Sequence, residues 1–350
     1  MKILVFGAGP LGSLKAARLH EAGHDVTVLA RNQRLADIKQ HGIVIVEDGS
    51  SEQQVARVKV TDRFTPEDYY DLVIVMRKNQ ATEIIPTLAA NKKVPTLLFM
   101  VNTAAGFDDL AGPLGKERVM MGFPYPGGQR DGHLMRVMPV NEKRKWTIPV
   151  GETDGSVTDR TRKVAKVLVS MRGYKVQVRK DMDAWLKNHV ALMIPAFAPA
   201  MYAANISMKR MGNTRDLLVL TLRGQREALR ALNKAGIPPS PGAMIRIHRS
   251  IPEPIMVGLL QIIMRKELGK ASMEGRPKAA RDEMRHLTDE LFAFLRSKGL
   301  SAPICESLYK YFDPDTPPLP EGTKELPLRW GGDLGLVGAI ALIVLAIVIL

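Results

Sequence analysis

The chain has 350 residues and a formal net charge of +14, with 45% hydrophobic and 25% charged residues. This length predicts about two domains, and this composition excludes global disorder. The single cysteine, Cys305, excludes an internal disulfide framework and a thiolate metal cluster. The histidines show no metal-ligand spacing, so no metal site is predicted.

The basic excess favours anionic partners such as nucleotide phosphates, acidic metabolites or lipid headgroups. No nucleic-acid-binding module is recognisable and aromatic residues are sparse, so no nucleic-acid partner is expected. Strand-like residues begin at Lys2, so no signal peptide is expected, and the folded domains are predicted to be cytoplasmic.

Short apolar runs alternate with amphipathic stretches over residues 1–179. The predicted strands are Lys2–Phe6, Asp25–Ala30, Arg57–Val60, Asp71–Met76, Thr96–Val101, Arg118–Gly122, Trp146–Val150 and Lys175–Val178. The helices predicted between them are Leu11–Ala22, Arg34–Gln40, Ala81–Ala90 and Asp159–Met171. This order predicts an α/β fold that begins with a Rossmann-type, doubly wound parallel sheet.

A glycine-rich turn lies between the first strand and the first helix. Residues 7–12 read GAGPLG, so Gly7, Gly9 and Gly12 match G-x-G-x-x-G. These glycines allow a tight turn, a close approach of a pyrophosphate and close helix–strand packing, while the helix starting at Pro10 and Leu11 presents free N–H groups. The unit predicts a dinucleotide site; the alternative is a glycine-rich turn without a ligand.

The end of the second strand indicates which dinucleotide binds. It reads Leu29-Ala30-Arg31-Asn32, without the acidic residue that binds the ribose 2′-hydroxyl of NAD. Arg31 can pair with a 2′-phosphate through its guanidinium, so the predicted cofactor is NADP(H), with Arg34 as a second candidate. The alternative interpretation of Arg31 is an ordinary surface arginine.

The strands stop after residue 179, and a helical second domain is predicted over 180–312. Its helices are predicted at Asp181–Ala204, Asn213–Ala235, Pro252–Leu268 and Lys278–Ser297. Gly236 and Gly299 follow two of them in the position of a left-handed cap. Five prolines in Asp313–Leu328 predict a linker, which is assigned to residues 313–333.

The final stretch, Leu334–Leu350, is 17 residues long and has no charged or polar side chain. As a helix it would span about 25 Å, near the thin end of bilayer cores. Residues 334–350 are therefore predicted to be a transmembrane helix that anchors the protein to a membrane. The alternative is a hydrophobic tail buried in a homodimer.

Taken in order, these motifs resemble the ketopantoate reductase family over roughly residues 1–312, as a divergent member. The resemblance rests on the glycine turn, Arg31, Gln80 after one strand, Asn102 at the end of the next, Lys187 on the first helix of the second half and Glu283 on a later helix. Arg77 stands where the family usually has lysine. Thr103, Ala191, Pro195 and the pair Thr288-Asp289 are further departures.

The resemblance implies NADPH-dependent reduction of a ketopantoate-like 2-oxo acid to the 2-hydroxy acid. It assigns catalysis to Lys187 as proton donor, Glu283 as the group that orients the lysine or holds a substrate hydroxyl, and Asn102 as a hydrogen-bond partner of the substrate. It assigns cofactor binding to a set of nine residues. They are Gly7, Gly9, Pro10, Leu11, Gly12, Arg31, Arg77, Gln80 and Asn102.

Two alternatives stay open. The first alternative is a related dehydrogenase that acts on a bulkier 2-oxo or 3-hydroxy acid. It is favoured because Ala191 and Pro195 replace family asparagines and make the pocket more apolar. The other is a regulatory protein that binds NADP and has lost the reaction. Pro195 is also predicted to kink its helix, and the oligomeric state is left open between monomer and homodimer.

Overall fold

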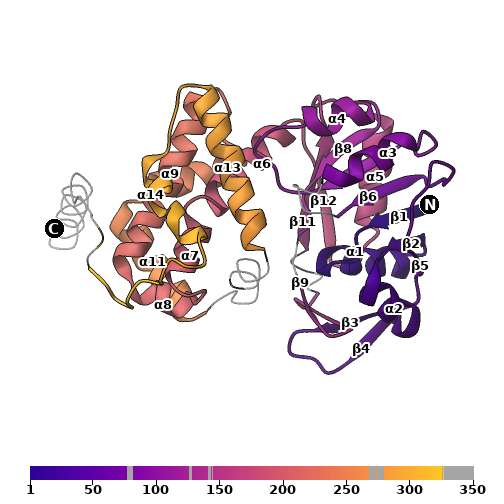
Figure 1. Ribbon diagram of the computed structural model, residues 1–350, viewed down its shortest axis with the longest axis horizontal. Helices are drawn as coiled ribbons and strands as arrows, with labels where there is room; N and C mark the ends of the chain where they lie inside the picture. The colour runs from indigo at the N-terminus through magenta and orange to yellow at the C-terminus, as the bar shows by residue number, and fades with distance from the viewer. Residues whose placement is uncertain are drawn as a thin grey trace, which may run out of the picture. The chain divides into compact units, whose positions relative to one another are not determined.

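The computed structural model describes residues 1–76, 82–125, 128–140, 143, 145–267, 274, 280–324 and 326. They divide into two compact units, Met1–Asp183 and the residues from Ala184 onward (Figure 1). The first unit is built on two β-sheets, and the second is helical in its described part.

An eight-stranded sheet forms the centre of the first unit, in the order β12-β11-β8-β7-β6-β1-β2-β5. The strands are β1 (Lys2–Phe6), β2 (Asp25–Leu29), β5 (Lys59–Thr61), β6 (Leu72–Val75), β7 (Leu97–Met100), β8 (Val119–Gly122), β11 (Trp146–Glu152) and β12 (Tyr174–Val178). The helices between them are α1 (Pro10–Glu21), α2 (Asn32–His41), α3 (Ile85–Ala90), α4 (Asp108–Leu114) and α5 (Asp159–Val169).

Six neighbouring strands of this sheet, in the order β5-β2-β1-β6-β7-β8, confirm the predicted doubly wound arrangement. All neighbours among them pair in parallel, and the chain grows outward from β1 in both directions. The apolar strands predicted to be buried on both faces are buried: Ile3, Leu4 and Val5 of β1 have no exposed surface. The carboxyl ends of β1 and β6 therefore form a topological switch point, where such sheets bind ligands.

The large sheet is not parallel throughout, because β11 pairs antiparallel with β8. The chain between these two strands contains a β-hairpin instead of a crossover helix, so it returns along β8 in the opposite direction. Two predicted element bounds are also corrected. The strand expected at Arg57–Val60 is β5 at Lys59–Thr61, and the helix expected from Ala81 is a 3₁₀ turn, Thr82–Ile84, followed by α3.

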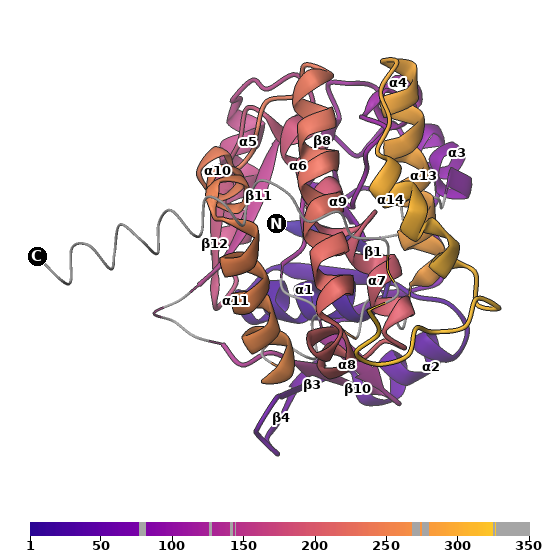
Figure 2. The same ribbon diagram turned by 90° about the vertical axis from the view of Figure 1, so that its left-hand side faces the viewer.

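A second sheet of four strands was not predicted. Its order is β4-β3-β10-β9, with β3 (Ile43–Glu47), β4 (Gln53–Ala56), β9 (Gly128–Asp131) and β10 (Leu134–Val137). It lies next to α2 in both views (Figures 1 and 2), and α1 contacts strands of both sheets. Strand β9 reads GQRD and is largely exposed, so it carries no apolar signal.

The second unit is a group of helices around α9 (Figure 2). Its helices are α6 (Met182–Met193), which begins in the last residues of the first unit, α7 (Phe197–Ala203), α8 (Met208–Asn213), α9 (Arg215–Lys234), α10 (Gly242–Ser250), α11 (Glu253–Arg265), α13 (Arg281–Ser297) and α14 (Pro303–Leu308). Helix α9 buries residues over its whole length and contacts α7, α8, α11 and α14.

Two expectations for the second half of the chain are corrected. The single helix expected at Asp181–Ala204 is interrupted between Met193 and Phe197, because Pro195 lacks the N–H group that would continue it. The expected linker is in part attached to the second unit. Leu319 N–H donates to the Ala203 carbonyl at 2.8 Å, and Gly322 N–H donates to Thr214 Oγ1 at 3.0 Å.

The predicted anchor, Leu334–Leu350, lies outside the described residues. Among the helices of the described ranges, none combines the length and the apolar character needed to cross a membrane.

Candidate active site

A cavity of about 210 Å³ opens at the carboxyl ends of β1 and β2. Its walls are the glycine turn Gly7–Gly9, the end of β2 with Arg31, Arg34 of α2, and two residues from distant parts of the chain, Ile84 and Arg130. The cavity therefore lies beside the switch point of the large sheet, as ligand sites in such folds do.

The glycine turn has the geometry that its sequence predicts. Gly7 has φ +120°, a conformation that residues with a Cβ rarely adopt. A Cβ on Gly12 would lie 2.0 Å from the Gly7 carbonyl oxygen, so α1 packs against the turn only because Gly12 has no side chain. A Cβ on Gly9 would meet no atom within 4 Å, which leaves open space beside this part of the backbone.

The N-terminus of α1 presents backbone donors at the same turn. The helix begins with Pro10, and its first intrahelical bond runs from Ser13 N–H to the Gly9 carbonyl at 2.9 Å. The N–H groups of Leu11 and Gly12 therefore have no intrahelical acceptor, and the first turn has no acidic side chain to compete for them. This end of α1 fits a phosphate group.

The two arginines predicted to select the cofactor differ in their surroundings. Arg31 is exposed at the cavity, and its guanidinium makes no hydrogen bond or ion pair with any residue in the described part of the chain. Arg34 is buried and donates to Ser13 Oγ at 3.0 Å and to the carbonyls of Ala8 and His133, both at 3.3 Å. Burial, and then the charge of Arg130, lower the pKa of Arg34.

Arg31 is thus available for an anion, whereas Arg34 is committed to protein acceptors and braces the turn. A dinucleotide fits the residues present, because open space at Gly9 and the guanidinium of Arg31 lie at one cavity, and the N-terminus of α1 directly follows Gly9. Arg130 was not identified from the sequence. It lies 99 residues beyond Arg31 in a polar strand, and only the pairing of β9 in the second sheet brings it here.

Asn102 follows β7 at the carboxyl edge of the same sheet. The residue is 2% exposed, and neither Oδ1 nor Nδ2 has a hydrogen-bond partner among the described residues. A buried amide left unpaired costs about 1–3 kcal/mol, and such groups are rare in folded proteins. The side-chain amide of Asn102 can therefore both donate a hydrogen bond to a ligand and accept one from it.

Lys187 and Glu283 are both buried in the second unit. The Lys187 ammonium lies 5.0 Å from the centroid of the Phe294 ring on α13. Glu283 is in the first turn of α13, eleven residues before Phe294, which is close to three turns of helix. Glu283 and Phe294 lie on one face of α13 but about 16 Å apart along the helix, and the contact of Lys187 is with Phe294.

The residues that replace family asparagines are apolar and buried: Ala191 has no exposed surface, and Pro195 is buried where α6 ends. Met201 and Met208 are fully buried in the core of the second unit. Arg77 and Gln80 lie outside the described residues. In the described ranges no group of three or more histidine, cysteine or acidic side chains is placed to hold a metal ion.

Part of the chain matches a known protein family. Residues 3–141 match the family model "Ketopantoate reductase PanE/ApbA". The chain is 28% identical over 215 residues to a 2-dehydropantoate 2-reductase of Mesorhizobium japonicum, in an alignment that spans 53% of this chain and 63% of that protein. It is 23% identical over 318 residues to the uncharacterised oxidoreductase YkpB of Bacillus subtilis, covering 88% of this chain and 97% of that protein.

Solved structures share the fold over nearly the whole described chain. A 2-dehydropantoate 2-reductase from Geobacter metallireducens superposes with a TM-score of 0.71 at 19% identity, covering 89% of this chain and 99% of that one. A D-mandelate dehydrogenase solved with NADH and anilino(oxo)acetate superposes with a TM-score of 0.66 at 16% identity, covering 89% and 97%. The chain is thus similar to the ketopantoate reductase family, whose model it matches over residues 3–141, and it shares the fold of the solved 2-dehydropantoate 2-reductase.

Proposed function

We propose that this protein reduces a 2-oxo acid to the 2-hydroxy acid with NADPH. The observation that carries the proposal is the cavity at the carboxyl ends of β1 and β2, where the glycine turn and the unpaired guanidinium of Arg31 face one space. The family binds nicotinamide dinucleotides and acts on small 2-oxo acids, and the named relatives are oxidoreductases.

The preference for NADPH rests on charge. A 2′-phosphate is a dianion that pairs well with a guanidinium, whereas a 2′-hydroxyl is usually bound by a carboxylate. Arg31, Arg34 and Arg130 line the cavity, and none of the described residues that line it is acidic. Pro10, Leu11 and Gly12 would present the start of α1 to the pyrophosphate, and Arg77 and Gln80 are proposed to contact the cofactor as in the family.

Bound NADPH would supply the hydride that reduces the carbonyl carbon. Lys187 Nζ would hydrogen-bond the carbonyl oxygen, withdraw electron density from it and donate a proton to it as negative charge develops. Glu283 would hold a substrate hydroxyl or orient the ammonium. The unpaired Asn102 amide would donate from Nδ2 to a substrate oxygen and accept at Oδ1.

The substrate is proposed to be more apolar than ketopantoate. Ala191 and Pro195 offer no hydrogen bond where the family has asparagines, and a site without such partners does not favour a hydroxyl on the substrate. The same observation favours the second candidate, a related dehydrogenase for a bulkier 2-oxo or 3-hydroxy acid.

The cofactor part of the proposal is tested with Arg31→Ala. The variant loses one charge-assisted pair, so the dissociation constant for NADPH should rise about 10-fold to 100-fold, while that for NADH stays within about twofold. Fluorescence titration of the purified protein with each cofactor measures both. Tighter binding of NADH than NADPH by the unmodified protein would contradict the assignment.

We also propose that residues 334–350 tether cytoplasmic catalytic units to a membrane. The support is the 17-residue apolar stretch, because a helix of this length is close to the thickness of a thin bilayer core. Residues 1–179 would then bind NADP and residues 180–312 would bind substrate, with any homodimer formed through the helical part.

A further inference from the structure

Arg130 is the feature of the cofactor cavity that the family pattern does not account for. It lies on β9 of the small sheet, with an exposed side chain that lines the same cavity as Arg31. Its guanidinium makes no hydrogen bond or ion pair with any residue of the described ranges. The adjacent acid, Asp131, is instead paired with Arg136 at 3.3 Å.

The hairpin that carries Arg130 is held in place from the side of α2. Arg34 donates to the carbonyl of His133, in the turn between β9 and β10, at 3.3 Å. The ring of His133 stacks on the ring of His41 with centroids 4.3 Å apart and an interplanar angle of 25°. Helix α2 begins immediately after Arg31, so one element positions both Arg31 and the turn next to Arg130.

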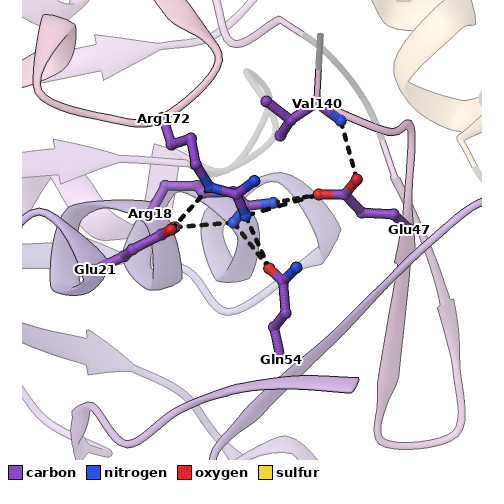
Figure 3. Close-up of polar contacts among 6 residues, drawn as sticks. All are labelled: Arg18, Glu21, Glu47, Gln54, Val140 and Arg172. Atoms are coloured by element: carbon purple, nitrogen blue, oxygen red, sulfur yellow. Dashed lines mark hydrogen bonds and ion pairs between the residues drawn. The ribbon is translucent and has the colours of Figure 1, made fainter. Parts of the chain in front are cut away.

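The small sheet is also attached to the phosphate-binding helix. Arg18 of α1, which is 2% exposed, donates to Glu47 of β3 at 3.1 Å and to Gln54 of β4 at 3.0 Å (Figure 3). Arg172 donates to the same Gln54 at 3.0 Å, and Glu47 accepts from Val140 N–H at 3.1 Å (Figure 3). Polar contacts on both sides thus fix the sheet that bears Arg130 relative to the glycine turn.

None of the described residues that line the cavity carries a negative charge to balance its arginines. Arg31, Arg34 and Arg130 line it, and the carboxylate of Asp37 near Arg34 accepts a hydrogen bond from Gln33 at 2.8 Å. Like charges held this close repel one another, so the folded chain keeps an arrangement that a bound dianion would stabilise.

We propose that Arg130 is a second specificity-determining residue for the cofactor, contacting the 2′-phosphate of NADPH from the small sheet, across the cavity from Arg31. The inference rests on the proposed function of this cavity. A phosphate dianion has three free oxygens, enough for two guanidinium forks, and each fork adds charge-assisted bonds that a 2′-hydroxyl cannot form.

The test is Arg130→Ala in the full chain, with NADPH, NADH and 2′,5′-ADP as titrants. The dissociation constants for NADPH and 2′,5′-ADP should rise about tenfold or more, and that for NADH should stay within about twofold. Arg130→Lys should recover part of the lost affinity, because it keeps the charge and loses the fork. The control is Arg162→Ala, an exposed arginine of α5 in the same unit that is not among the residues lining the cavity, which should change no constant.

The outcomes separate this inference from the proposed function. If Arg31→Ala weakens NADPH binding and Arg130→Ala does not, the role of Arg130 is refuted and the cofactor assignment survives. If neither variant changes the dissociation constant for NADPH, both the role of Arg130 and the cofactor assignment are refuted. Equal losses for NADPH and NADH in Arg130→Ala would show a structural effect on the hairpin and would also overturn the inference. In a double variant that carries Arg31→Ala and Arg130→Ala, the losses of NADPH affinity should be non-additive, since both guanidinium groups bind one phosphate.

Discussion

Lys15, on the helix that follows the glycine turn, has no exposed surface. Its ammonium donates to the Tyr125 carbonyl at 2.5 Å and to the Tyr174 hydroxyl at 2.8 Å, and it lies 4.0 Å from the centroid of the Tyr174 ring. Burial, and then the nearby charge of Arg18, hold the pKa of Lys15 well below the ordinary lysine value of 10.5. The buried position of Lys15 could not be predicted, because α1 has no acidic partner for it and its contacts come from residues more than 100 positions away.

The lowered pKa of Lys15 predicts how stability depends on pH. Between the folded-state pKa and 10.5, the unfolded chain binds a proton that the folded chain does not, so the contribution of this group to stability rises with pH. Lys15→Met should remove that rise. The free energy of unfolding in urea, measured at about pH 7 and about pH 10, should therefore increase less with pH in the variant.

Lys92→Met is the control for this measurement, because Lys92 is an exposed lysine of the same unit. It should keep the pH dependence of the unmodified protein. Parallel pH profiles for Lys15→Met and the unmodified protein would show that Lys15 is not responsible.

At the scale of elements, the glycine turn was predictable and the small sheet was not. The turn is encoded locally, since Gly7, Gly9 and Gly12 act through the backbone over six residues. The small sheet pairs β3 with β10, which are about 90 residues apart in the sequence. Its edge strands, β4 and β9, are largely polar. No local pattern contains that pairing, so Arg130 could not be placed at the cavity from the sequence.

The turn supplies a prediction that separates folding from binding. Gly9→Ala should keep the melting temperature of the unmodified protein, because a Cβ there meets no atom within 4 Å and φ is −67°. It should still weaken NADPH binding by about tenfold or more, because the methyl group would occupy the approach of the pyrophosphate. Thermal unfolding and cofactor titration of the same sample measure both effects.

Gly12→Ala is the matched variant, for which a loss of stability is expected. Its Cβ would lie 2.0 Å from the Gly7 carbonyl oxygen, so α1 must shift, and the free energy of unfolding should fall by about 1–3 kcal/mol. Equal losses of stability in the two variants would contradict this account of the turn.

At the scale of the whole molecule, the eight strands of the large sheet and the change to helices in the described part of the second half were predictable from apolar periodicity. The break at Pro195 was predicted as a kink and is larger, because two separate helices form around it. The attachment of residues 313–324 to the second unit was missed, since the contacts of Leu319 and Gly322 run through backbone groups that a proline-rich composition does not reveal.

The apolar C-terminal stretch makes a prediction about the intact protein. The full chain should sediment with membranes after cell lysis and be released by detergent, whereas a chain ending at Leu328 should remain in the supernatant. Burial of the 17 apolar residues in lipid is the reason. Recovery of both chains in the supernatant would rule out the anchor, and detergent-resistant pelleting of the full chain would indicate aggregation.

The central claim is that the protein is an NADPH-dependent reductase of 2-oxo acids with Lys187 as proton donor. The most direct measurement follows NADPH absorbance with a panel of 2-oxo acids of increasing side-chain size, for the unmodified protein, Lys187→Ala and the exposed-lysine control Lys209→Ala. We predict turnover with at least one acid, a loss of about 10²-fold to 10⁴-fold in kcat for Lys187→Ala with NADPH binding retained, and no change for Lys209→Ala. NADPH binding without oxidation by any acid, or full activity in Lys187→Ala, would contradict the claim.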